Sequence, residues 1–205
     1  MTAPLPDLIR AATGTLIEHA EELTALDSAI GDGDHGLNMK RGALAIQEKL
    51  SELEAKSFND ALKAMGMICM GKIGGSAGPV FGTLLMTLSK ELPAAPGPAD
   101  VARALGAAMA AVSKLGKAEV GQKTLLDVLD PVRRLLENPG DLRGEALVDA
   151  VRRCAQDAAD ATAKMDAIKG RASFLGERAL GHVDPGSRST ALIIAAVCDG
   201  IRRHP

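Results

Sequence analysis

Aromatic side chains are almost absent from this sequence, which has no tryptophan, no tyrosine and only three phenylalanines. β-Sandwiches and β-barrels are built from alternating runs of β-branched and aromatic residues, and the sequence has no such run. Alanine, leucine and glycine dominate instead, and alanine both favours helices and lets them approach one another closely. The composition therefore predicts an all-α protein.

Cysteine pairs, basic stripes and long apolar runs are also missing. Cys69, Cys154 and Cys198 are far apart among apolar neighbours, which argues against a disulfide framework and against a zinc site. The formal net charge is −2 and the basic residues form no stripe, so nucleic acid is not an expected partner. No apolar run approaches the roughly 18 residues of a membrane span, and we find no signal peptide. We expect a cytoplasmic protein with no membrane partner.

Apolar residues recur with a helical period along most of the chain and predict about eight helices. The expected ranges are residue 5 to a glycine-rich turn at 31–36, 37–50, 58–71, 79 to about 90, 99–115, 122–137, 143–168 and 188–202. Pro131 predicts a kink or a late start in the helix 122–137. A length of 205 residues suits a single domain, 1–205, whose antiparallel helices form a bundle or barrel with its glycine turns at one end.

The densest polar motif contains Asp27, Asp32 and Asp34, three carboxylates within eight residues that also include glycines. Like charges this close repel one another unless a cation lies between them, and oxygen ligands alone suit Mg²⁺ or Ca²⁺. An EF-hand is excluded, because its register would put Leu37 at the required glycine and Ala43 at the required glutamate. Two interpretations remain: a Mg²⁺ site that holds nucleotide phosphates, or a solvated acidic turn whose carboxylates cap helices.

Other motifs are weaker when each is taken alone. The segment 71–79 lacks the spacing of a Walker A loop, and is either a phosphate-binding turn before a helix or a tight interhelical connection. The segment 184–187 is equally a capped helix start. The irregular stretch 169–186 is long enough to indicate a functional lid, in which Arg171 is either a phosphate clamp or an exposed charge. The four histidines form no recognisable nucleophile–base pair.

Taken together, four segments resemble the nucleotide-binding (L-type) subunit of dihydroxyacetone kinases. They are LDSAIGDGDHGLNMKRG, GGSAGPVFGTLL, GKAEVGQKT and KGRASFLGERALGHVDPGSRST, in this order, and the resemblance spans about residues 23–192. It implies a ring or barrel of eight antiparallel helices with the nucleotide bound at one end. It also favours the metal interpretation of the acidic motif.

The resemblance implies a set of site residues. Asp27, Asp32 and Asp34 would ligate two Mg²⁺ ions that bridge the phosphates of ADP or ATP. The implied nucleotide-binding residues are His35, Gly36, Leu37, Asn38, Ser76, Ala77, Gly116, Leu125, Arg171, Asp184, Pro185 and Gly186, with Gly116 and Leu125 beside the adenine. Leu125 stands where a methionine is expected, and Arg188 stands in a stretch of small residues and receives no role.

The implied activity is phosphoryl transfer from Mg-bound nucleotide to dihydroxyacetone held on a partner subunit. A partner is expected because 205 residues leave no room for the triose-binding domain. A stand-alone chain favours the phosphoenolpyruvate-dependent type, in which ADP stays bound and a phosphohistidine-carrying phosphotransferase subunit rephosphorylates it; a homodimer stays open. The alternatives are a kinase subunit for another small ketose such as erythrulose, a non-catalytic nucleotide-sensing regulatory protein, and a metal-free helical scaffold.

Overall fold

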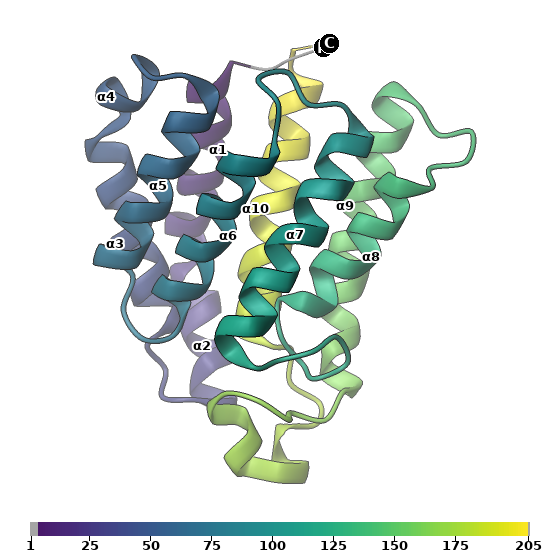
Figure 1. The fold of residues 1–205 in the computed structure, drawn as a ribbon. Coiled ribbons are helices and arrows are strands. Elements are labelled where there is room, and N and C mark those ends of the chain that lie inside the picture. The colour runs from purple at the N-terminus through teal and green to yellow at the C-terminus, as the bar shows by residue number, and fades with distance from the viewer. Residues whose placement is uncertain (1–3, 205) are drawn as a thin grey trace.

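The computed structural model describes residues 4–204, and the regular structure in this range is entirely helical (Figure 1). The α-helices are α1 (Leu5–Glu18), α2 (Ala20–Ile30), α3 (His35–Glu48), α4 (Leu50–Glu54), α5 (Phe58–Lys72), α6 (Ala77–Glu91), α7 (Pro98–Gly116), α8 (Leu126–Glu137), α9 (Gly144–Ala161) and α10 (Pro185–Arg202). Two 3-10 segments, η1 (Thr162–Lys164) and η2 (Arg171–Ala179), lie between α9 and α10. The expected all-α fold is confirmed.

The long helices form a closed ring around an apolar core. Each helix packs against the next in the order α3, α5, α6, α7, α8, α9 and α10, and α1 closes the ring by packing against both α10 and α3. Neighbouring helices run antiparallel, so the connections alternate between the two ends of the ring (Figure 1). The predicted antiparallel barrel is therefore present.

Small residues let the helices of this ring approach closely. The side chains of Ala61, Ala104 and Ala155 are fully buried. α5 and α6 cross at Gly66 and Gly82, where a Cβ added to Gly82 would lie 2.9 Å from the backbone oxygen of Gly66. The scarcity of aromatic residues thus goes with a core built on short interhelical distances.

Two helix boundaries follow local backbone signals. The first predicted helix is divided into α1 and α2 at His19, whose φ of −93° and ψ of 12° interrupt the helix. α8 begins only at Leu126, where the Leu126 N–H donates to Thr124 Oγ1 at 3.3 Å, and Pro131 lies inside the helix and not at its start.

The predicted helix 143–168 is wrong in its last turns, because α9 ends at Ala161. The hydroxyl of Thr162 donates to the Ala159 oxygen at 2.6 Å, and the Thr162 oxygen accepts from Lys123 Nζ at 2.6 Å. The Thr162 carbonyl therefore bonds to a side chain from another part of the chain, and the segment continues as a 3-10 turn.

The four glycine-rich loops lie at one end of the ring, the lower end in Figure 1, where α3, α6, α8 and α10 begin. At the opposite end, Ser57 caps α5 by accepting from the Asp60 N–H at 3.1 Å. At the lower end, the N-cap residues of α3 and α6, Asp34 and Ser76, make no side-chain capping bond. Backbone N–H groups at the start of a helix attract anions, so this end suits a phosphate ligand.

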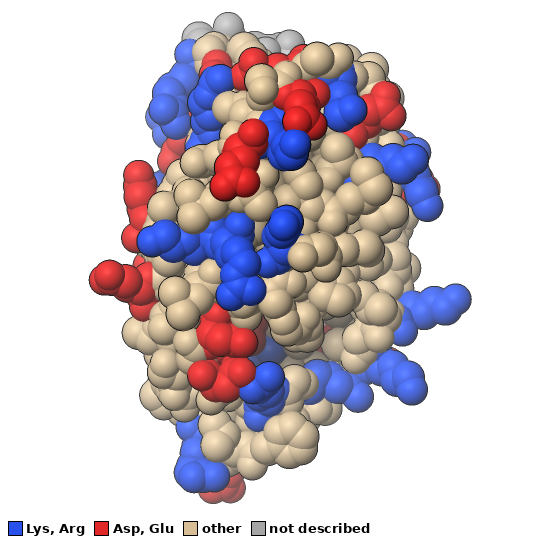
Figure 2. Space-filling model, turned by 90° about the vertical axis from the view of Figure 1, so that its left-hand side faces the viewer, with Lys and Arg blue, Asp and Glu red and all other residues tan. Residues whose placement is uncertain are grey.

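Among residues 4–204, no helix has the length and apolar character that crossing a membrane requires. On the face drawn in Figure 2, basic and acidic side chains are interspersed and form no continuous stripe of one sign.

Substitution of Gly82 by alanine tests the close crossing of α5 and α6. The new Cβ would lie 2.4 Å from Met70 Cγ and 2.9 Å from the Gly66 oxygen, so the helices must separate. We expect the free energy of unfolding to fall by about 1–3 kcal/mol. The control is Gly14→Ala in α1, where an added Cβ meets no atom within 4 Å and should stabilise by about 0.5–1 kcal/mol. Urea unfolding measures both variants, and a stabilised Gly82→Ala would contradict the close crossing.

Candidate nucleotide and metal site

Asp27, Asp32 and Asp34 form an acidic cluster at the lower end of the ring. One carboxylate oxygen from each lies within 4.8 Å of the other two. Asp27 is buried in the last turn of α2, whereas Asp32 and Asp34 belong to the loop that leads into α3. The three carboxylates singled out in the sequence thus meet at one point, where a divalent cation would offset their repulsion.

Asp27 holds this loop in place. Its Oδ2 accepts from the backbone N–H of Asp34 at 2.9 Å and from that of His35 at 3.1 Å, so Asp27 caps α3 from the preceding helix. Its Oδ1 faces Gly31, where an added Cβ would come within 2.1 Å of that oxygen. Glycine at 31 therefore leaves space beside the carboxylate that any other side chain would fill.

The first turn of α3 joins the acidic cluster to two other glycine motifs. His35 Nε2 lies 3.1 Å from Ser189 Oγ in α10. The buried Asn38 lies against the second motif, because a Cβ added to Gly74 would be 2.5 Å from Asn38 Oδ1. Burial lowers the pKa of His35, although two carboxylates of the acidic cluster act in the opposite direction. Burial therefore favours the neutral form of the His35 imidazole, which suits a hydrogen-bonding role.

The start of α6 offers backbone donors beside this turn. Ser76 is exposed and makes no capping bond, and Ala77 is the first residue of α6. The first N–H groups of a helix have no partner within it. Ser76 and Ala77 can therefore donate to an anion bound at this end of the ring.

Residues 165–184, here called the lid segment, cover part of the same end. Arg171, at the start of η2, forms an ion pair with Asp32. A cavity of about 410 Å³ lies between the lid segment and the acidic loop, lined by Ile30, Gly31, Asp32, Arg171, Phe174 and Leu175. Phe174 is 86% exposed, so this rim presents an apolar surface.

Asp184 ends the lid segment and begins α10. Its Oδ2 accepts from the Ser187 backbone N–H at 2.7 Å and from Ser187 Oγ at 2.9 Å, so it is a helix cap. Burial raises the pKa of Asp184 to about 6, against the opposing effects of the Ser187 hydrogen bonds and the Lys123 charge. Pro185 and Gly186 form the first turn of α10 beside it.

Three other residues from the sequence analysis belong to α7, to the turn before α8 and to α10. Gly116 is exposed at the last turn of α7, and Leu125 is buried in the core just before α8. Arg188 Nε donates to Glu22 Oε1 at 2.6 Å, and its Nη1 donates to Gln156 Oε1 at 2.5 Å. Arg188 therefore ties α10 to α2 and α9, which is a structural role that the sequence did not indicate.

The sequence analysis missed two buried charged residues at this end, Lys123 and Asp127, which are 2% and 4% exposed. Asp127 Oδ2 accepts from the Thr124 N–H at 2.7 Å, and its Oδ1 accepts from the Gly121 N–H. Lysine and aspartate are ordinarily exposed, and nothing in the spacing of this motif signals their burial.

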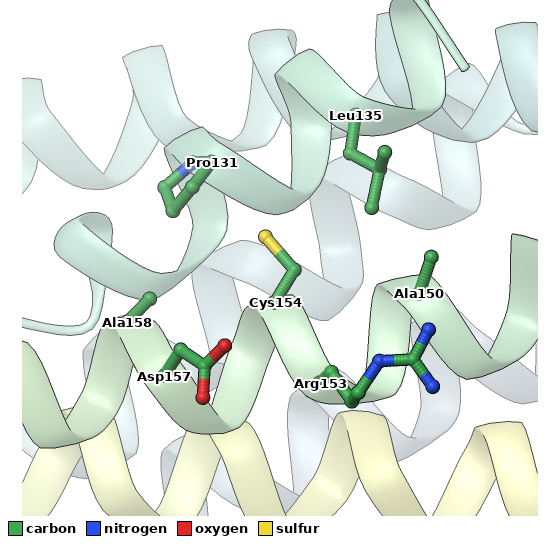
Figure 3. A pocket seen from close by; sticks show the side chains of 7 residues that line it. All are labelled: Pro131, Leu135, Ala150, Arg153, Cys154, Asp157 and Ala158. Atoms are coloured by element: carbon green, nitrogen blue, oxygen red, sulfur yellow. The ribbon is translucent and has the colours of Figure 1, made fainter. Parts of the chain in front are cut away.

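A larger cavity, of about 550 Å³, lies between α8 and α9 (Figure 3). Its lining consists of Pro131, Leu135, Ala150, Arg153, Cys154, Asp157 and Ala158. Burial raises the pKa of the Cys154 thiol, so the thiol is not activated as a nucleophile. Among the described residues that line this cavity, only Cys154 and Asp157 are of a type that binds metals, and they do not form a group of three.

This chain belongs to the DAK2 domain family, whose profile matches residues 29–199. It is 38% identical over 181 residues to the PEP-dependent dihydroxyacetone kinase 1, ADP-binding subunit DhaL, of Listeria innocua, and this covers 88% of this chain and 87% of that protein. It is also 38% identical over 179 residues to the corresponding DhaL subunit of Escherichia coli, with 85% of each chain covered.

Longer proteins contain a similar region. The human triokinase/FMN cyclase is 36% identical over 189 residues, which cover 90% of this chain and 33% of that protein. The crystal structure of the dihydroxyacetone kinase from C. freundii in complex with AMP-PNP and Mg²⁺ superposes with a TM-score of 0.76 at 25% identity. The match covers 95% of this chain and 33% of that one, so this chain spans about a third of the longer kinase.

The raised pKa of Asp184 predicts a pH-dependent stability. The folded-state pKa of about 6 lies above the ordinary value of 3.8, so the folded protein binds more protons between these values. Stability from this group is therefore fully present below about pH 4 and is lost as pH rises through about 6. Asp184→Asn should remove this loss, while its amide oxygen still accepts from Ser187. From pH 4 to pH 7 the unfolding free energy of Asp184→Asn should rise relative to that of the wild type by roughly 3 kcal/mol at most.

Urea unfolding of the wild type and of Asp184→Asn in nucleotide-free buffer, at intervals from about pH 4 to 7, measures this shift. Asp157→Asn, a substitution of an exposed carboxylate on α9, is the control and should follow the wild-type profile. Parallel profiles for the wild type and Asp184→Asn would contradict the argument.

Proposed function

We propose that this chain is the nucleotide-binding subunit of a dihydroxyacetone kinase and transfers phosphate from Mg-bound nucleotide to dihydroxyacetone held on a partner subunit. The observation that carries the proposal is the convergence of Asp27, Asp32 and Asp34 within 4.8 Å at the end of the ring where α3 and α6 begin. The relatives named as ADP-binding DhaL subunits, which match over almost their whole length, support it. Residues 1–205 would form a single domain, because α1 and α10 close the ring together.

The donor set of the acidic cluster fits Mg²⁺. All three side chains offer hard carboxylate oxygens, and the space that glycine leaves at position 31 lies beside Asp27 Oδ1. Asp27, Asp32 and Asp34 would hold two Mg²⁺ ions in this proposal. When bound, Mg²⁺ neutralises the charge that develops on the transferring phosphoryl group.

The chain's own residues would bind and orient the nucleotide. The N–H groups of Gly36 and Leu37 in the first turn of α3 and those of Ser76 and Ala77 would donate to phosphate oxygens, and His35 and Asn38 would line the nucleotide site. Arg171, which pairs with Asp32, would also reach a phosphate placed between them. Asp184, Pro185 and Gly186 would border the site, and Gly116 and Leu125 would provide an aliphatic surface for adenine.

Exposed apolar side chains around the site support a partner subunit at this end. Leu37 is 59%, Ile168 is 53% and Phe174 is 86% exposed, and a partner that covered them would remove this apolar surface from water. The triose-binding subunit would dock here, so that its substrate meets the nucleotide. In the phosphoenolpyruvate-dependent form of the proposal, a phosphohistidine-carrying subunit would use the same end to rephosphorylate bound ADP.

Substitution of Asp32 by asparagine tests the metal site. The amide removes one negative charge from the cluster, so Mg-dependent affinity for ADP should fall at least about tenfold. The helical far-UV circular dichroism should stay unchanged, because Asp32 lies in a loop and is not a core residue. Isothermal titration of ADP in Mg²⁺ buffer measures the loss, with Asp157→Asn as the control. Unchanged ADP affinity in Asp32→Asn would count against the proposed function.

Chelation tests whether the metal retains the nucleotide. We expect the purified chain to carry ADP and Mg²⁺ in native mass spectrometry, and EDTA followed by dialysis to remove both. We expect removal of Mg²⁺ to release ADP, because the carboxylates and the phosphates repel one another once the cation is gone. ADP that stays bound at the same occupancy after complete removal of Mg²⁺ would contradict a metal-bridged site.

A further inference from the structure

Lys123 is a buried cation whose contacts are all with the lid segment and the residues that lead into it. Its side chain is 2% exposed, and its Nζ donates to the Thr162 oxygen at 2.6 Å, to the His182 oxygen at 2.7 Å and to the Met165 oxygen at 3.4 Å. Thr162 and Met165 lie where the chain enters the lid segment, and His182 lies near its end. One ammonium group therefore fastens both ends of the same segment.

The two ends also bond to each other around this ammonium group. The Gly181 N–H donates to the Ala163 oxygen at 2.8 Å, and the Asp184 N–H donates to Thr162 Oγ1 at 3.0 Å. Thr162 is fully buried. The base of the lid segment is thus a closed hydrogen-bonded loop with Lys123 at its centre.

The backbone that carries Lys123 is itself fixed. Residue 123 has a φ of 61°, a left-handed conformation that a lysine adopts only when its surroundings impose it. The buried Asp127 accepts from the N–H groups of Thr124 and Gly121 on either side. The ammonium group is therefore presented to the lid segment from a rigid turn.

The middle of the lid segment has a different anchor. η2 lies beside α2, and Arg171 pairs there with Asp32 of the acidic cluster. The position of Arg171 relative to the carboxylates thus depends on where the base of the segment is held.

We propose that Lys123 is a positioning residue: by fastening both ends of the lid segment it places Arg171 beside Asp32, and thereby slows release of the bound nucleotide. This inference rests on the proposed function for its nucleotide consequence. The ammonium group of Lys123 does more than fill space, because three carbonyl oxygens accept hydrogen bonds from it. These oxygens would lose their donor if the ammonium group were removed.

The experiment compares Lys123→Met, which keeps the side-chain length and removes the charge, with Lys123→Gln, which keeps a shorter neutral donor in case the first variant does not fold. Lys164→Met, an exposed lysine beside the base of the lid segment, is the matched control. The rate of ADP release in Mg²⁺ is measured by stopped flow for each variant, in the wild-type background and with Arg171→Leu. Hydrogen exchange of peptides covering 163–184 is followed in the nucleotide-free proteins.

We expect Lys123→Met or Lys123→Gln to release ADP roughly tenfold faster and Lys164→Met to release it at the wild-type rate. In the Arg171→Leu background the substitution at 123 should add little, because both changes remove the same contact. Exchange in 163–184 should accelerate. Full additivity with Arg171→Leu, or an unchanged release rate, would overturn the inference.

The two proposals fail differently. A wild-type chain that binds no ADP in Mg²⁺ would refute the proposed function, and exchange would then decide the inference alone. Faster exchange confined to 163–184 in the Lys123 variants would support the positioning role, and unchanged exchange would overturn it.

Discussion

Two backbone N–H groups donating to one carboxylate oxygen, Asp27 Oδ2, determine the arrangement of the whole site end. This pair of bonds ties the start of α3 to the last turn of α2, and the loop that carries Asp32 and Asp34 has to turn back within that span. The positive end of the α3 dipole lies against Asp27 and offsets part of the negative charge gathered there. The remaining repulsion among the three carboxylates would be relieved by a divalent cation.

The antiparallel ring explains why the motifs meet although they are far apart in the sequence. Because neighbouring helices alternate in direction, every second connection returns to the same end, and α3, α6, α8 and α10 all begin there (Figure 1). Four helix N-termini facing one region gather the positive ends of their dipoles there, and such ends favour anions. The antiparallel order therefore gathers the N-termini of these four helices at one end of the ring and their carboxyl termini at the other.

Much of the fold was accessible from the sequence, since helical periodicity and proline placement are local signals. The range 58–71 agrees closely with Phe58–Lys72. The end of α9 was missed because it depends on Thr162 meeting Lys123, a contact between residues 39 positions apart. Helical periodicity is a local pattern and carries no information about a hydrogen bond between residues so far apart in the sequence.

The candidate site could be predicted from the sequence to a similar extent. Three aspartates and their glycines indicated the acidic cluster, and the irregular stretch 169–186 indicated Arg171, whose pairing with Asp32 joins the lid segment to the acidic loop. The sequence did not predict the burial of Lys123 and Asp127 or the structural role of Arg188. Each is a charged side chain whose burial or partner follows only from tertiary packing, and residue type alone favours exposure.

Closure of the ring by α1 and α10 makes the order of the helices cyclic. Asp7 Oδ2 and His204 Nε2 lie 3.3 Å apart, so the chain enters and leaves the ring at neighbouring points, at the end remote from the acidic cluster (Figure 1). A circular permutant that joins these points through a short linker and opens the chain in the connector between α6 and α7 would keep every helix contact. Since the helices do not depend on where the polypeptide starts, the same ring can be built into a longer polypeptide without changing its binding end.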